Sequence, residues 1–175
     1  RDGTEAVVRA KAARDGRLRL FSTPEARNKA EQLGAVLPHL DGKIAVFTDA
    51  DAALEPGCLR EIAGMFAADP RTALVGAAVR PASRLREERI HWLLLNKIWR
   101  LEGEVFSSAG FSGVCYAARP EALRAMDGSV LAEDIHIGLL AGARGLRSRI
   151  CPSAIATESR VPQTSAEFVR FRRRR

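Results

Sequence analysis

Short apolar runs alternate along the chain with segments whose apolar residues recur at helical spacing. Four apolar runs have the length of buried strands, at residues 43–48, 73–79, 114–118 and 147–156. A shorter alternating run predicts a further strand at 17–21. Helices are predicted at 4–13, 25–37, 56–68, 84–105, 133–143 and 165–175, with a brief one opened by Pro120. This alternation predicts an α/β layered fold with a largely parallel central sheet.

The longest predicted helix, at residues 84–105, carries a stripe of apolar residues. The stripe consists of Ile90, Leu94, Ile98 and Leu101, and the same helix carries Trp92 and Trp99. Such a stripe is typical of a helix that packs against a protein core, so we expect it to be buried. The alternative is an interfacial helix that lies against a membrane or a partner.

Two carboxylates, Asp49 and Asp51, directly follow the apolar run at 44–47. In open α/β sheets, ligands bind beyond the carboxyl ends of the strands, so the pair lies where such a fold places its chemistry. Oxygen ligands of this kind suit a hard divalent cation that shares its coordination with phosphate oxygens. The alternative is a solvated turn after a strand, because a lone Asp-x-Asp pattern is weak without context.

A second acidic position, Asp134, stands with Glu133 at the start of a predicted helix. There a carboxylate either serves as a general base or stabilises the N-terminal end of the helix. The most loop-like interior stretch contains Gly110, Phe111, Ser112 and Gly113. Its glycines either let backbone amides approach a ligand or form an ordinary turn before a strand.

Basic residues occupy two places of interest. Lys29 follows Asn28 early in a predicted helix, where it either meets a phosphate or base edge or is solvated. Five of the seven net positive charges lie at the C-terminus, in Arg170 and residues 172–175. A basic segment of this kind binds phosphate in a nucleic acid, a lipid headgroup or a nucleotide, unless it is merely solvated.

The chain has 175 residues, which suits a single domain over residues 1–175. Its contents of 46% hydrophobic and 28% charged residues are typical of a globular protein. No stretch reaches the about 18 uninterrupted apolar residues of a membrane span. Cys58, Cys115 and Cys151 form no cluster with histidine, so we expect no zinc site, and we expect reduced thiols in a cytoplasmic compartment.

Taken in order, these segments resemble one known family. The order is NKA at 28–30, VFTDAD at 46–51, GFSG at 110–113, AED at 132–134 and then an arginine-rich helix. It resembles the family 2 glycosyltransferases of the GT-A fold, particularly membrane-associated bacterial members related to cellulose and hyaluronan synthases. The opening RDGTEAVV resembles the end of the family's DGSxDGT segment. The resemblance implies a GT-A (Rossmann-like) three-layer sandwich that lacks its first strands.

The resemblance also implies roles for residues. Asp49 and Asp51 would bind a divalent metal, Mg²⁺ or Mn²⁺, and the diphosphate of a nucleotide sugar. Asp134 would be the base that deprotonates an acceptor hydroxyl, with Glu133 in support. Further contacts with the nucleotide sugar are implied for Asn28, Lys29, Arg170, Arg173 and Arg174. Contacts with the acceptor are implied for Gly110, Phe111, Ser112 and Gly113.

The implied activity is an inverting transfer of a sugar from a nucleotide-diphosphate sugar, a UDP-sugar above all, to a glycan or lipid-linked acceptor. The implied place is the cytoplasmic face of the bacterial inner membrane, with attachment through flanking segments. In the family's QxxRW motif, Arg170 replaces Gln and Arg174 replaces Trp here, which argues against a processive polymer synthase.

Two other functions stay open. A nucleotidyltransferase also uses a pair of strand-end acids with a metal, and a non-enzymatic basic module would use the arginine tail to bind nucleic acid. The nearly balanced charge outside the tail argues against the nucleic-acid module.

Overall fold

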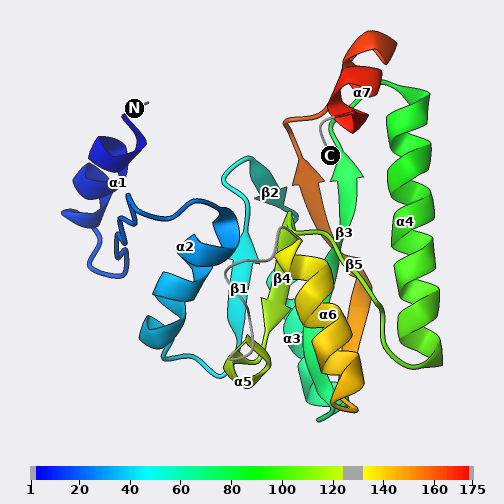
Figure 1. Ribbon diagram of the computed structural model, residues 1–175, viewed down its shortest axis with the longest axis horizontal. Coiled ribbons are helices and arrows are strands. Elements are labelled where there is room, and N and C mark those ends of the chain that lie inside the picture. The colour runs from blue at the N-terminus through cyan, green and yellow to red at the C-terminus, as the bar shows by residue number, and fades with distance from the viewer. Residues whose placement is uncertain (1–2, 124–131, 174–175) are drawn as a thin grey trace.

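The computed structural model describes residues 3–123 and 132–173. Within these residues, the centre of the molecule is a five-stranded sheet with the order β1-β4-β3-β5-β2 (Figure 1). The strands are β1 (Ala45–Thr48), β2 (Ala52–Leu54), β3 (Thr72–Pro81), β4 (Cys115–Ala118) and β5 (Arg147–Glu158). The four longer apolar runs of the sequence therefore form strands as predicted.

The sheet is mixed rather than mostly parallel. β3 and β5 pair in parallel, whereas β4 is antiparallel to β1 and β3, and β2 is antiparallel to β5. The expectation of a mostly parallel sheet was therefore wrong. The reason lies in the connection to β4, where α4 (Arg86–Val105) leads away from the end of β3 and the segment 106–114 returns along the molecule (Figure 1). β4 consequently starts beside the end of β1 and pairs with the first half of β3.

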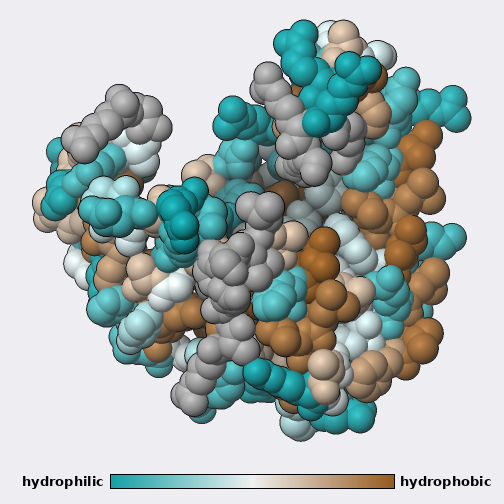
Figure 2. Space-filling model, viewed as in Figure 1, coloured by the Kyte–Doolittle hydropathy of each residue, from teal (hydrophilic) through white to brown (hydrophobic). Residues whose placement is uncertain are grey.

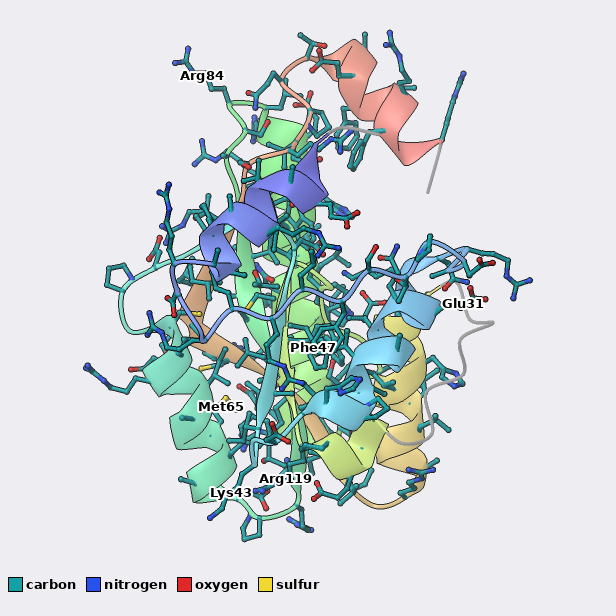
Figure 3. The ribbon with its side chains drawn as sticks, turned by 90° about the vertical axis from the view of Figure 1, so that its left-hand side faces the viewer. Glu31, Lys43, Phe47, Met65, Arg84 and Arg119 are labelled. Carbon is teal, nitrogen blue, oxygen red and sulfur yellow. The ribbon has the colours of Figure 1, made fainter. Side chains whose placement is uncertain are left out.

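Helices cover the sheet on both faces. On one face, α3 (Cys58–Ala68) buries Ile62 and Phe66 against alternate residues of β3, β4 and β5. On the other face, α5 (Pro120–Leu123) and α6 (Glu133–Ala143) bury a second cluster that includes Ile137 and Tyr116. The ring of Phe47 on β1 stacks on Tyr116, with ring centroids 4.8 Å apart (Figure 3). The sheet is thus the middle of three layers.

The remaining helices lie at the ends and edges of this sandwich. α2 (Lys29–Val36) continues into a 3₁₀ turn, η1 (Leu37–His39), before β1, and α7 (Ser165–Arg172) follows β5. α1 (Thr4–Ala12) buries none of its residues and stands apart from the sheet (Figure 1). The segment 17–21, predicted as a strand, has no strand structure, because no neighbouring strand pairs with it.

The apolar stripe of α4 faces outward, contrary to the prediction that it is buried. Exposed fractions are 42% for Ile90, 52% for Leu94, 48% for Ile98 and 44% for Leu101. The side of α4 that is buried carries Glu88, Trp92 and Gly103 instead. Among the described helices, none is both long and apolar enough to cross a bilayer.

The three cysteines are free and buried in the core between α3 and the sheet. Burial is the main cause that raises the pKa of the Cys115 thiol to about 12, and the neighbouring Cys58 adds to it. Burial likewise raises the pKa of Cys58. The thiols of Cys58 and Cys115 are therefore protonated, apolar parts of the core at neutral pH.

Close packing between β3 and the loop before β4 gives a test of the fold. A Cβ added at Gly76 would lie 2.6 Å from the Phe111 Cβ and 2.8 Å from the Ile150 Cδ1. We therefore expect Gly76→Ala to lower the free energy of unfolding by about 1–3 kcal/mol, measured by urea denaturation. The matched control is Gly64→Ala on α3, where a Cβ meets nothing within 4 Å. That change should raise stability by about 0.5–1 kcal/mol, and equal effects of the two would contradict the packing.

Candidate active site

The Asp49–Asp51 turn lies at the edge of the sheet where β1 and β5 end and β4 begins. The Asp49 backbone N–H donates to the carbonyl oxygen of Val114 at 3.0 Å, and the Ala52 N–H donates to the Asp49 carbonyl at 3.1 Å. The carbonyl of Asp51 accepts from the N–H of Ser159 at 3.2 Å and from its hydroxyl at 2.6 Å. The turn is thus tied to both neighbouring strands, which leaves the two carboxylates projecting from a fixed backbone.

A cleft of about 480 Å³ opens beside this turn. Its lining residues are Asp49, Asp51, Glu158, Arg160, Val161, Pro162, Glu167, Arg170 and Phe171. The wall opposite the turn is formed by α7, which stands over the ends of β3 and β5 (Figure 1). α7 begins with a capping box, in which Thr164 accepts from the Glu167 N–H and the Glu167 carboxylate accepts from the Thr164 N–H. This cap holds the first turn of the helix, and with it the wall, in one orientation.

Lys29 reaches the turn from α2. Its ammonium lies 2.7 Å from the Asp49 Oδ1 and 3.4 Å from the carbonyl oxygen of Gly113. The neighbouring Asn28 caps α2, where its side chain accepts from the Glu31 N–H at 2.9 Å. Asn28 therefore sets the start of the helix, and the helix brings Lys29 to the acid pair. Lys29 and Asn28 were both site candidates from the sequence, and the structure brings Lys29 into contact with a third candidate, Asp49.

Asp134 lies next to the same loop. One oxygen of its carboxylate accepts from the Gly113 N–H at 3.1 Å, and the other accepts from the Ile135 N–H at 2.9 Å. A Cβ built on Gly113 would lie 3.3 Å from the Lys29 Nζ and 3.4 Å from the Asp134 Oδ2. Gly113 thus stands between the lysine that pairs with Asp49 and the carboxylate of Asp134. The structure brings these two acidic positions together, although 85 positions of sequence separate them.

The other residues of the glycine loop pack inward. The side chain of Phe111 is 1% exposed and packs against Tyr116, with ring centroids 4.9 Å apart. The Ser112 hydroxyl accepts from the Val114 N–H at 3.2 Å, and a Cβ on Gly110 would lie 3.0 Å from the Trp99 Nε1. These three residues therefore shape the loop from below, so a ligand would meet its backbone rather than their side chains.

The arginine candidates are divided between the cleft and the surface. Arg170 lines the cleft, whereas Arg173 caps the C-terminal end of α7, is exposed and is absent from the lining. Arg174 lies outside the described residues. Glu133 is the first residue of α6, so the sequence placed the pair Glu133–Asp134 correctly at a loop-to-helix junction.

Comparison with known proteins shows the family of the chain. The profile of Glycosyl transferase family 2 matches residues 1–126, which is more than half of the chain. The chain belongs to glycosyl transferase family 2. The match ends before Asp134 and α7, so these parts of the site rest on the structure. No curated protein matches the chain.

Solved structures of the same fold extend over almost the whole chain. The chain is similar to a mannosyltransferase from Pyrobaculum calidifontis in complex with GDP-Man and Mn²⁺, with 27% identity and a TM-score of 0.79. That similarity covers 99% of this chain and 48% of the mannosyltransferase. The GT-A fold expected from the sequence is therefore confirmed, and the chain spans about half the length of this relative.

A more distant similarity is found to glucosyl-3-phosphoglycerate synthase from Mycobacterium tuberculosis. Its complex with Mn²⁺ and UDP-glucose has 18% identity and a TM-score of 0.54, over 98% of this chain and 61% of that one. Its complex with Mg²⁺ and UDP has 19% identity and a TM-score of 0.52, over 92% of this chain and 58% of that one. At this level of identity the similarity supports the fold alone.

Two residues that line the cleft, Glu158 and Arg160, were not predicted from the sequence. Glu158 is the last residue of β5 and is buried, and Arg160 follows it into the cleft. The signal that would have found them is their position beyond the end of a strand, at the same edge as Asp49. The strand predicted from the sequence ends at residue 156, whereas β5 continues to Glu158.

The Lys29–Asp49 pair gives a test of how the site is held. Their side chains are 41% and 37% exposed, and pairs of this exposure contribute little to stability. We therefore expect a double-mutant cycle of Lys29→Met and Asp49→Asn, followed by urea denaturation, to give a coupling free energy of about 0–1 kcal/mol. A coupling above about 2 kcal/mol would show that the pair is structural rather than available to a ligand.

Proposed function

We propose that the chain is the catalytic domain of an inverting glycosyltransferase. It transfers a sugar from a nucleotide-diphosphate sugar, most simply a UDP-sugar, to the hydroxyl of a glycan or lipid-linked acceptor. The observation that supports the proposal best is that an acid pair and two arginines line one cleft, while a third carboxylate, on Asp134, is held by backbone amides next to the acid pair. The similarity to transferases solved with GDP-Man and UDP-glucose supports the same class of donor.

A divalent cation, Mg²⁺ or Mn²⁺, fits the acid pair. The carboxylate of Asp51 accepts no hydrogen bond from any described residue, while one oxygen of Asp49 already pairs with Lys29. In the described parts of the chain, no three His, Cys, Asp or Glu side chains are grouped to hold a metal. Such a donor set suits a cation that takes its other ligands from water and the diphosphate oxygens. When bound, the cation would neutralise negative charge on the departing nucleoside diphosphate.

The cations of the cleft complement the same leaving group. Arg160 and Arg170 line the cleft opposite the acid pair, and neither makes an ion pair with a described residue. Guanidinium groups bind phosphate oxygens through charge-assisted hydrogen bonds, which strengthen as negative charge develops on the leaving group. Lys29 adds a third cation on the far side of Asp49. The diphosphate would therefore lie between Lys29 on α2 and the arginines near α7.

Asp134 is the proposed base. The two amides that bond its oxygens, from Gly113 and Ile135, hold the carboxylate in one orientation, and each oxygen keeps a lone pair free. A base must lie within hydrogen-bond reach of the proton that it removes. The acceptor hydroxyl would therefore approach Asp134 beside Gly113, where a Cβ would lie 3.4 Å from the Asp134 Oδ2. Glu133 would support Asp134 from the preceding position.

The proposed reaction is a single displacement. The acceptor oxygen forms its bond to the anomeric carbon as the bond to the diphosphate oxygen breaks, and Asp134 takes the hydroxyl proton. The transition state resembles an oxocarbenium ion, so positive charge develops on the sugar ring and negative charge develops on the leaving group. Because attack and departure occur on opposite sides of one carbon, its configuration inverts.

The remaining expectations, a role in polysaccharide biosynthesis and a place at the cytoplasmic face of the bacterial inner membrane, rest on the resemblance to membrane-associated members.

The role of Asp134 is tested by Asp134→Asn. The amide keeps the shape of the side chain but cannot accept the proton, so we expect the rate of transfer to fall about 10²–10⁴-fold while donor binding is unchanged. The measurement is product formation from the nucleotide sugar in the complete protein. The matched control is Asp41→Asn, at a side chain that is 90% exposed. Transfer by the Asp134 variant at the rate of the control would refute the base assignment.

The metal site is tested by Asp51→Asn. We expect this variant to lose the dependence of UDP binding on Mn²⁺, because the carboxylate that has no other partner is removed. Isothermal titration of UDP with and without Mn²⁺ measures the effect, again beside Asp41→Asn. Binding that Mn²⁺ strengthens equally in both variants would count against a metal held by Asp51.

A further inference from the structure

The outward stripe of α4 is larger than its four predicted residues. Leu93 is 66% exposed and Val105 is 88% exposed, so apolar side chains follow the outer side of the helix from its second turn to its end. Figure 2 shows this band of hydrophobic residues down the side of the molecule formed by α4. Contiguous exposed apolar surface of this kind marks an interaction site in a folded protein.

The buried side of α4 fixes the stripe outward. The indole N–H of Trp92 donates to the Glu88 carboxylate at 3.0 Å, inside the protein. The Asn96 amide exchanges two hydrogen bonds with the backbone of Val79 on β3, at 2.8 Å and 3.1 Å. At the far end, a Cβ on Gly103 would lie 3.3 Å from the Arg149 Cα. Rotation of the helix would break these contacts, so the apolar stripe is presented permanently.

Cations lie on one side of the stripe, where Arg86 and Lys97 are interleaved with the apolar residues and Arg89 lies outside them. Arg86, Arg89 and Lys97 are exposed and recur at helical spacing beside the apolar residues, and none of them makes an ion pair with a described residue. Arg100 continues the row and pairs with Glu104 at 3.5 Å. Of the other acids on α4, Glu88 is buried, Glu102 accepts hydrogen bonds from Ser108 and Ala109, and Glu87 lies on the opposite flank. The helix therefore has an apolar outer side with positive charge along one border.

A groove lies between the start of this row and the end of β3. Its volume is about 810 Å³, and its walls include three arginines and several apolar side chains. Arg80 lies at the end of β3, where Glu55 pairs with it. Arg86 and Arg89 face the groove from the first turn of α4, beside Ile90 and Leu93. Guanidinium groups above an apolar wall suit a ligand with an anionic head and an apolar tail.

We propose that the α4 surface, defined as the apolar stripe with Arg86, Arg89 and Lys97, docks on an anionic lipid bilayer. The apolar side chains enter the boundary between headgroups and acyl chains, and the flanking cations bind lipid phosphates. The groove holds one lipid headgroup between Arg86 and Arg89. This docking needs no sugar donor, so it stands or falls independently of the transferase reaction.

The test is flotation of the purified protein with vesicles. We expect binding to phosphatidylcholine vesicles that contain phosphatidylglycerol, and at least ten-fold weaker binding to phosphatidylcholine alone. Arg86→Gln with Arg89→Gln should reduce binding to the anionic vesicles about 30-fold, because each cation near such a surface contributes a factor of about five. Leu94→Gln with Ile98→Gln should remove binding to both kinds of vesicle. All four side chains are exposed, so these changes leave the core intact.

Matched controls come from the exposed side of α3. Leu59→Gln and Arg60→Gln change exposed residues of the same types and should bind the vesicles like the unchanged protein. Excess inorganic phosphate should not displace the protein, because the apolar contacts are absent from that ligand. The proposal is overturned if the α4 variants bind as the controls do, or if phosphate alone displaces the protein. It is equally overturned if light scattering shows a dimer that the Leu94–Ile98 variant dissociates.

Discussion

The antiparallel placement of β4 between β1 and β3 is the constraint on which the site depends. Because β4 runs against its neighbours, its first residue lies beside the last residue of β1, and the pairs run from Thr48 with Cys115 to Ala45 with Ala118. The loop that precedes β4 is thereby placed next to the turn that follows β1. The backbone bond between Asp49 and Val114 is the direct result, and Gly113 stands one residue further on. A parallel β4 would have put this loop at the opposite edge of the sheet.

Around this junction, the three aspartates differ in their hydrogen-bond and ion-pair partners, so each suits a different chemical role. Asp49 is partly neutralised by Lys29, Asp51 is open to the cleft, and Asp134 is held by two backbone amides. The arrangement separates a carboxylate suited to a metal from one suited to a proton. It also leaves arginines on the far wall, at a place where a diphosphate would complete the charge balance. The chemistry proposed for the cleft follows from this division of roles among three aspartates.

The α4 helix shows how a correct helix can be assigned the wrong buried side. Its apolar residues at 90, 94, 98 and 101 recur at the spacing of a core-facing stripe. The residues that are buried are Glu88, Trp92 and Gly103 instead. Periodicity reports that apolar residues share one side of a helix, and it contains no information about what lies opposite that side. Two tryptophans and a small glycine, which fit closely against β3 and β5, outweigh four aliphatic side chains here.

The sequence by itself determined the order of strands and helices, the strand-end position of Asp49 and Asp51, and the loop-to-helix position of Asp134. These features are local, since they follow from apolar runs, capping residues and glycines within a few positions. The direction of β4, the short strand β2, the contribution of Arg160 and the outward side of α4 were decided only by the tertiary structure. Each of them depends on pairing or packing between segments far apart in the chain, and such partners leave no periodic signal in the residues themselves.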